Sequence, residues 1–335
     1  MKTIAFFNNK GGVGKTSLVY HIAWMMSMIG ISTLAADLDP QSNLTSAFLE
    51  DDQIERMWNL EAGRPTIYGA IEPRLQGVAD VALVRPAQCA ERLHVLPGDL
   101  MLAKFEDKLA TSWIDCHNDE SDPSGDFYTM RSLWQAVRLS AADCGAAIAL
   151  IDVGPNVGAL NRAALIGADH VVVPLGADLF SLQGLSNLGP TLQGWRAGWQ
   201  KRRANASKNA KKDLELPSGA MAPLGYVVLN PSVRERYPVK AYRKWADRIP
   251  ERYATRVLQQ VEGPVAPTPA ADSNCLAMIK HYKSLMPMAQ EQRKPMFLLK
   301  AADGAVGGHA GAVQDCFAQF EKLAQRILSD AEIST

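Results

Sequence analysis

Short apolar runs alternate with longer segments of helical periodicity along the first 230 residues of the chain. Runs rich in aliphatic and β-branched residues predict six strands, near residues 3–7, 33–37, 93–96, 147–151, 170–174 and 224–229. The segments between them are long enough for the crossover helices that parallel strands require. The pattern therefore predicts an α/β fold, a doubly wound and mostly parallel sheet with helices on both faces.

Two helices can be predicted with approximate ends. The first should run from about Lys15 to Ile29 with Gly30 at its carboxyl-terminal cap, its large apolar side chains facing the sheet. Near the other end of the chain, apolar residues recur at helical spacing from Phe317 to Leu328. A membrane anchor would be more basic and truly terminal, so we favour a helix packed on the sheet.

Length and composition indicate a soluble globular protein. The chain has 335 residues, 47% of them hydrophobic and 21% charged, and no apolar run approaches the ~20 residues of a membrane span. We expect one enlarged domain over residues 1–335, with insertions near 111–128, 196–222 and 270–305. Because the first strand begins almost at Met1, there is no room for a signal peptide or an N-terminal helix-turn-helix domain, and a cytoplasmic location is expected. The five cysteines form no C-x-x-C pair and are interpreted as ordinary thiols.

A glycine-rich loop follows the first strand and precedes the first helix. Glycines let the backbone approach phosphate oxygens, and the exposed amides and helix N-terminus attract the anion. Lys15 is spaced to reach the β- and γ-phosphates, and the Thr16 hydroxyl suits Mg²⁺. The predicted nucleotide-binding residues of this loop are Gly11, Gly12, Val13, Gly14, Lys15, Thr16 and Ser17.

The loop departs from the common pattern G-x-x-x-x-G-K-[ST]. Asn9 stands where that pattern has glycine, and a second lysine, Lys10, precedes the glycines. The spacing Lys10-Gly-Gly-Val-Gly-Lys15-Thr16 is the deviant Walker A motif, and with it the chain resembles the ParA/MinD family of ATPases.

Later segments extend the resemblance. The stretch from Asp37 to Asn43, D-L-D-P-Q-S-N, resembles the family's switch segment, and the apolar run Ile148–Asp152 resembles its Walker B strand. Matches in order and rough spacing continue with residues 161–169, 170–174 and 181–185, and become thinner beyond about residue 190. Taken alone, Asp37, Asp39 and Asp152 could each be a polar strand end without chemistry.

The resemblance implies a mechanism with ATP and Mg²⁺ as cofactors. Lys15 and the loop amides would hold the phosphates, and Thr16, Asp39 and Asp152 would form the metal site. Asp39 matches the position that orients the attacking water, and Lys10 matches the lysine that reaches across a dimer to the partner's ATP. The resemblance therefore implies a slow ATPase that forms an ATP-dependent homodimer, with Lys10, Lys15 and Asp39 in catalytic roles.

The adenine contacts are predicted less completely. The strand that ends at Asn230 resembles the family strand ending near the adenine, so Asn230 could bind the base or could be a simple strand end. Lys294-Pro295 resembles the family's G-K-P turn. Pro267-Thr268-Pro269 stands roughly where the family has an I-P-x-N segment.

Charge is unevenly distributed although the net charge is zero. Residues 115–126 hold five acidic residues and no lysine or arginine, which predicts an exposed loop. Residues 196–212 hold seven basic residues and no acidic one, a second basic stretch spans 234–256, and residues 203–223 are interpreted as an insertion or mobile loop. Such stretches suit contact with the phosphate backbone of nucleic acid, although a solvated helix face explains them as well. The candidate DNA-binding residues are Lys201, Arg202, Arg203, Lys211, Lys212, Arg243 and Lys244.

Three functions remain open from the sequence. The basic stretches favour a ParA-like partition ATPase that coats nucleoid DNA nonspecifically and acts with a ParB-like or cargo-adaptor protein. The insertions favour a non-partition relative that positions or regulates a protein cargo. A metabolic ATP-dependent enzyme is the third reading, but cysteine ligands for a reductase and a substrate motif for a ligase are both missing.

Overall fold

A computed structural model of the chain describes residues 1–117, 124–209, 214–229, 239–260, 262–282 and 284–333. Within them an eight-stranded sheet has the order β3-β4-β2-β5-β1-β6-β7-β8. The strands are β1 (Lys2–Phe6), β2 (Thr33–Asp37), β3 (Ala87–Ala90), β4 (Leu93–Leu96), β5 (Ile148–Asp152), β6 (His170–Gly176), β7 (Ala222–Leu229) and β8 (Cys275–Ile279). All neighbouring strands are parallel except β3 and β4. The predicted α/β fold with a mostly parallel sheet is confirmed, and the sequence missed the two edge strands β3 and β8.

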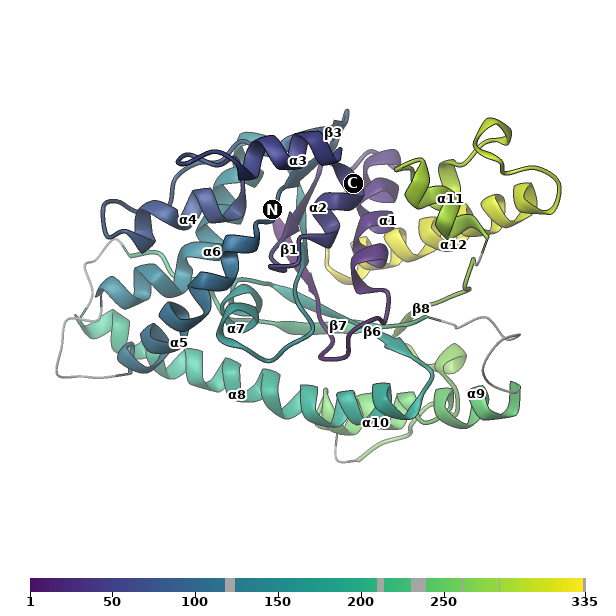
Figure 1. Cartoon of the computed structure of the whole chain (residues 1–335). Helices are drawn as coiled ribbons and strands as arrows, with labels where there is room; N and C mark the ends of the chain where they lie inside the picture. Colours follow the sequence, from purple (N-terminus) through teal and green to yellow (C-terminus); the bar gives the residue numbers. More distant parts are fainter. Residues whose placement is uncertain (118–123, 210–213, 230–238, 261, 283, 334–335) are drawn as a thin grey trace.

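Helices cover both faces of the sheet (Figure 1). They are α1 (Lys15–Met28), α2 (Asn43–Phe48), α3 (Asp51–Trp58), α4 (Ile67–Leu75), α5 (Glu106–Asp115), α6 (Ser124–Asp143), α7 (Ala159–Ile166), α8 (Leu179–Asn209), α9 (Val239–Ala246), α10 (Ile249–Arg256), α11 (Leu285–Glu291) and α12 (Gly308–Asp330). Successive strand residues point to opposite faces, so Ala5 of β1 joins the core under α4 to α8 while Ile4 and Phe6 join the core under α1, α11 and α12.

The two predicted helices have the expected positions. Gly14, with φ 84°, precedes α1, and Gly30, with φ 93°, follows its end. In α12 the side chains of Phe320, Leu323 and Ile327 are buried in the same core as α1. The interpretation of this segment as a helix packed on the sheet is therefore confirmed. No helix in the described ranges combines the length and apolar character needed to cross a lipid bilayer.

The expectation of a loop over residues 203–223 is wrong for its first part. Helix α8 continues to Asn209 through the lysine-rich sequence. Trp199 is fully buried and donates its indole hydrogen to the carbonyl of Pro217 at 2.9 Å, while Arg196 donates to the carbonyl of Met221. These contacts hold residues 217–221 against α8. They join positions far apart in the sequence, so local composition could not predict them.

The structure also places the Pro267-Thr268-Pro269 segment relative to the last strand. Pro267-Thr268-Pro269 precedes β8, because residues 269–271 form a short 3₁₀ turn before that strand. The residues that follow β8 are Lys280, His281 and Tyr282. The prolines therefore lie before the last strand of the sheet and not after it.

Candidate functional site

The glycine-rich loop lies at the carboxyl end of central strand β1, where ligands bind in open parallel sheets. Gly12 and Gly14 have φ of 72° and 84°, a left-handed conformation that other residues adopt only under strain. Asn8 fastens the loop to β6 by donating to the carbonyl of Pro174 at 2.6 Å, and its side-chain oxygen accepts from the amide of Lys10 at 3.0 Å. The loop is thus pre-shaped to present backbone amides.

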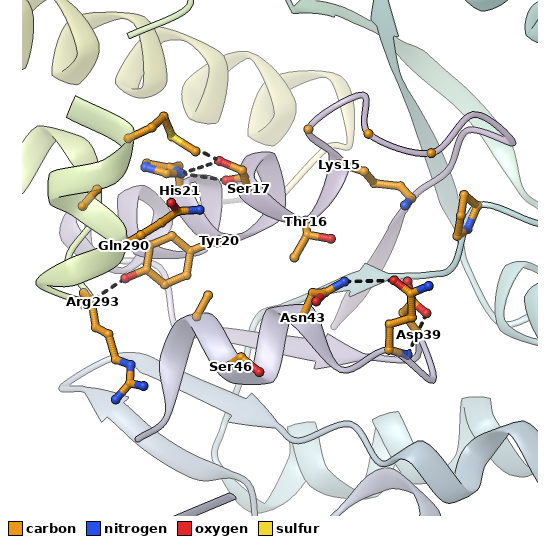
Figure 2. A pocket seen from close by; sticks show the side chains of 18 of the residues that line it. Lys15, Thr16, Ser17, Tyr20, His21, Asp39, Asn43, Ser46, Gln290 and Arg293 are labelled. Atoms are coloured by element: carbon orange, nitrogen blue, oxygen red, sulfur yellow. Dashed lines mark hydrogen bonds between the residues drawn. The ribbon is translucent and has the colours of Figure 1, made fainter. Parts of the chain in front are cut away.

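A cavity of about 660 Å³ opens beside this loop (Figure 2). Four segments far apart in the sequence form it: the loop with the start of α1, the loop after β2 with α2, Pro155 after β5, and α11 with the turn that follows it. Of the predicted site residues, those lining the cavity are Gly11, Gly12, Gly14, Lys15, Thr16, Ser17 and Asp39. Val13, Lys10 and Asp152 are not among the lining residues, and Asn230 lies outside the described residues.

Asp152 is fully buried at the end of β5, and neither of its carboxylate oxygens has a hydrogen-bond partner in the described part of the chain. Burial raises the pKa of this carboxyl to about 6, although the charge of Lys15 lowers it, as do the Thr16 hydroxyl and the Val153 amide, which lie near the carboxylate without meeting hydrogen-bond geometry. A buried carboxylate without partners is costly. Its position beside Thr16 fits a metal ion, because oxygen ligands are those that Mg²⁺ prefers.

The described residues contain no cluster of three His, Cys, Asp or Glu side chains arranged to hold a metal. Mg²⁺ keeps several waters and is usually bound through one or two protein oxygens plus substrate phosphates. Thr16 and Asp152 therefore fit a magnesium that arrives with a nucleotide, and Asp39 lines the same cavity.

Asp37 and Asp39 lie two residues apart in different environments. Burial raises the pKa of Asp37 to about 7, and the neighbouring Asp152 raises it further. Asp37 nevertheless accepts hydrogen bonds from the amide and hydroxyl of Thr45, at 2.8 and 2.7 Å, and from the amide of Asp39. It holds the chain in place after β2, whereas Asp39 accepts from the amide of Gln41 and faces the cavity.

Lys10 points to its own chain in this structure. Its ammonium group pairs with Asp178 at 2.7 Å and lies 5.9 Å from the ring centroid of Phe180. Burial raises the pKa of Asp178, but hydrogen bonds from Lys10 and Ser181 outweigh burial and hold this pKa below its usual value. Asp178 also accepts from the amide of Ser181 at the start of α8. Lys10 is thus held by an acidic group of its own subunit.

The sequence missed the far end of the cavity. It is lined by Tyr20, His21, Met286, Ala289, Gln290 and Arg293, together with Lys294 of the Lys294-Pro295 turn. Residues 286–293 fall where the family resemblance is thin, and the Lys294-Pro295 turn was the nearest signal to them.

His21 supports this end from inside the fold. Its Nδ1 lies 2.7 Å from the carbonyl of Ser17 and its Nε2 accepts from the amide of Met296 at 3.1 Å, so the ring is neutral with its hydrogen on Nδ1. Burial lowers the pKa of His21 to about 4.

The candidate DNA-binding residues do not form one surface. Lys201 and Arg203 lie near the carboxyl-terminal end of α8, whereas exposed Arg243 and Lys244 lie on α9. Figure 1 shows these elements at opposite ends of the helical layer, since α8 has 31 residues and is about 45 Å long. The described basic residues of the two stretches therefore lie apart within one chain.

Arg202 is engaged within the fold. Its guanidinium carbon lies 3.8 Å from the ring centroid of Trp113, and the group donates to the carbonyls of Trp113 and Gly198. Lys211 and Lys212 lie outside the described residues.

Comparisons with known proteins agree with this geometry. The profile of the AAA_31 family, an AAA domain, matches residues 1–202. The chromosome-partitioning ATPase Soj of Thermus thermophilus is 31% identical over 205 residues, which cover 60% of this chain and 66% of that protein. The matched part thus spans just under two thirds of that relative's length.

Two solved structures share the fold. The structure of protein DIP2308 from Corynebacterium diphtheriae matches with a TM-score of 0.73 at 22% identity, covering 98% of both chains. The complex of Cyanothece McdA with ATP matches with a TM-score of 0.61 at 15% identity, covering 100% of this chain and 98% of that one. At these identities the two structures establish the fold alone.

Proposed function

We propose, because this chain belongs to the AAA_31 family of ParA- and MinD-like P-loop ATPases, that it hydrolyses ATP as the switch of a partition or positioning system. The observation that carries the proposal is Asp152, a fully buried carboxylate beside the phosphate loop that has no hydrogen-bond partner among the described residues. Such a group is stabilised by a bound metal ion, and a nucleotide would bring that ion.

The residues around the cavity have complementary roles in this proposal. Lys15 and the loop amides bind the phosphates, and Thr16 and Asp152 hold Mg²⁺, which neutralises the charge that develops on the transferred phosphoryl group. Asp39 orients the attacking water from the opposite wall of the cavity. Phosphoryl transfer needs positioning and charge neutralisation more than covalent chemistry, so this set is sufficient for slow turnover.

We also propose that ATP joins two copies of the chain and that the dimer binds DNA without sequence preference. In the dimer Lys10 leaves Asp178 and reaches the partner's nucleotide. Arg243 and Lys244, exposed on α9, contact the phosphate backbone, and hydrolysis lowers the affinity. A ParB-like or cargo-adaptor protein would stimulate turnover, and the complex would act in the cytoplasm on the nucleoid.

The test separates the two basic clusters. The double variant Arg243→Glu/Lys244→Glu should lower the affinity of the ATP-bound dimer equally for duplexes of unrelated sequence. Because the dimer carries two copies of each residue, the dependence of log K on log salt should flatten by about four. Lys201→Glu/Arg203→Glu, at the other end of the layer, is the matched control and should bind DNA nearly as wild type. ATP hydrolysis without DNA should stay near normal in both.

A second function is favoured by the separation of the basic clusters. Without one continuous basic surface, the chain could act on a protein cargo instead of nucleoid DNA. Absence of DNA binding at low salt with ATP, in a protein that still hydrolyses ATP, would establish this second function over the first.

A further inference from the structure

The end of the cavity far from the phosphate loop is closed by Arg293, the second residue after α11. Figure 2 shows Arg293 and Tyr20 at one end of the cavity and Lys15 toward the other. The Tyr20 hydroxyl donates to the carbonyl of Arg293 at 3.0 Å, which fastens this turn to α1.

The guanidinium group of Arg293 crosses to a different segment of the chain. It pairs with Glu50 and, at 2.7 Å, with Asp51 at the start of α3. These acidic residues follow the loop that carries Asp39 and the short helix α2. Arg293 thus joins the carboxyl-terminal part of the site to the segment that begins with the proposed water-orienting residue.

The backbone of Arg293 is strained. Its φ of 46° is left-handed, a conformation that residues with a side chain rarely adopt. Glycine would fit this turn without strain, and the G-K-P turn that Lys294-Pro295 resembles has glycine at this position. Backbone hydrogen bonds from the amide of Arg293 to the carbonyl of Gln290, at 3.3 Å, and from the amide of Lys294 to the carbonyl of Ala289, at 3.1 Å, close this turn as the carboxyl-terminal cap of α11, in which a left-handed residue is usual.

A nucleotide on the phosphate loop would extend toward Arg293. The cavity continues from Thr16 and Ser17 toward α11, and the Met286 sulfur lies 3.9 Å from the Ser17 hydroxyl. With the triphosphate on the loop amides, a nucleoside that follows this continuation of the cavity would lie in the compartment between α1 and α11. This step rests on the proposed nucleotide-binding function.

We propose that Arg293, Glu50 and Asp51 form a clasp that closes the base end of the nucleotide cavity and slows nucleotide release. The side chain of Arg293 is 26% exposed, whereas those of Glu50 and Asp51 are 69% and 87% exposed. Exposed pairs are weak and are screened by salt, so the clasp opens readily and more often at high ionic strength. A switch protein must exchange ADP for ATP, and a weak clasp permits this.

The experiment measures release of radiolabelled ADP, in the presence of Mg²⁺, after a chase with excess unlabelled ADP. Arg293→Gly removes the guanidinium and the strain together, so the fold should be retained. Glu50→Gln/Asp51→Asn removes the acceptor charges and leaves Arg293 in place. Arg326→Ala, which removes an exposed pair with Asp330 on α12, is the matched control.

We expect about threefold to tenfold faster release from both clasp variants and an unchanged rate from the control. Release from wild type should accelerate with salt, and both clasp variants should lose most of that dependence. Wild-type rates in either clasp variant, or unchanged salt dependence, would overturn the clasp. If wild type binds no ADP at all, the proposed nucleotide site itself fails and the clasp fails with it.

Discussion

Replacing Asp152 by asparagine should stabilise the nucleotide-free protein and abolish its stabilisation by Mg²⁺ and ATP. The carboxyl is fully buried without hydrogen-bond partners, and burial raises its pKa from 3.8 to about 6. Because the pKa of Asp152 is raised in the folded state, the stability that this carboxyl contributes is fully present below pH 4 and is lost as the pH rises through about 6. At about 1.4 kcal/mol per pKa unit, the charged carboxylate costs about 3 kcal/mol at neutral pH. Asparagine has nearly the same shape and carries no charge, but its buried amide also lacks partners among the described residues, which offsets about 1–3 kcal/mol of this gain.

Asp37→Asn is the matched control for this reasoning. Burial also raises the pKa of Asp37, but its carboxylate accepts from two groups of Thr45 and from the Asp39 amide. The amide nitrogen of asparagine cannot accept these bonds, and an unsatisfied buried donor costs about 1–3 kcal/mol. Asp37→Asn should therefore gain far less stability than Asp152→Asn, or lose stability.

The assay is thermal unfolding at pH 7.0 with and without Mg²⁺ and ATP. With about 2.1 cal/mol/K of unfolding entropy per residue, 3 kcal/mol corresponds to about 4 °C for a chain of 335 residues. After the offset from the unpaired amide, Asp152→Asn should melt up to about 3 °C above wild type without ligand and should gain little when both ligands are added. A lower melting temperature without ligand would refute the assignment of an orphaned charge, and a full ligand-induced increase would refute the metal role.

The remaining predictions concern other residues of the site. Asp39→Ala should bind ATP and Mg²⁺ but lose hydrolysis, and size-exclusion chromatography with ATP should show a persistent dimer; normal phosphate release would assign the water to another residue. Lys10→Ala should bind ATP normally by calorimetry yet dimerise poorly. If this variant dimerises like wild type, Lys10 does not leave its pair with Asp178 to join the two subunits. Burial lowers the pKa of His21 from 6.5 to about 4. The contribution of His21 to the free energy of unfolding is therefore full above pH 6.5 and falls by about 3 kcal/mol as the pH drops to 4. Urea unfolding between pH 7 and 4.5 should therefore show a smaller stability loss for His21→Gln than for wild type, and equal losses would contradict a neutral buried imidazole.

The sequence by itself determined the elements whose signal is local. Strands β1, β2 and β5 are short apolar runs, and the loop before α1 has glycines at the two positions that require positive φ, Gly12 and Gly14. The edge strands gave weaker signals: β3 is only four residues long and half-exposed, and β8 lies beyond the well-matched part of the chain. Sequence analysis therefore predicted the centre of the sheet and the phosphate side of the cavity.

Only the tertiary structure decided which of these residues have partners. Asp37 and Asp152 are both acidic strand ends in the sequence, yet one is satisfied and the other is not. Arg202 is one of several adjacent basic residues, but it alone among Lys201, Arg202 and Arg203 lies against Trp113, 89 positions earlier in the chain. Local periodicity specifies the face on which a side chain lies, while burial and hydrogen bonding depend on segments that only the folded chain brings together.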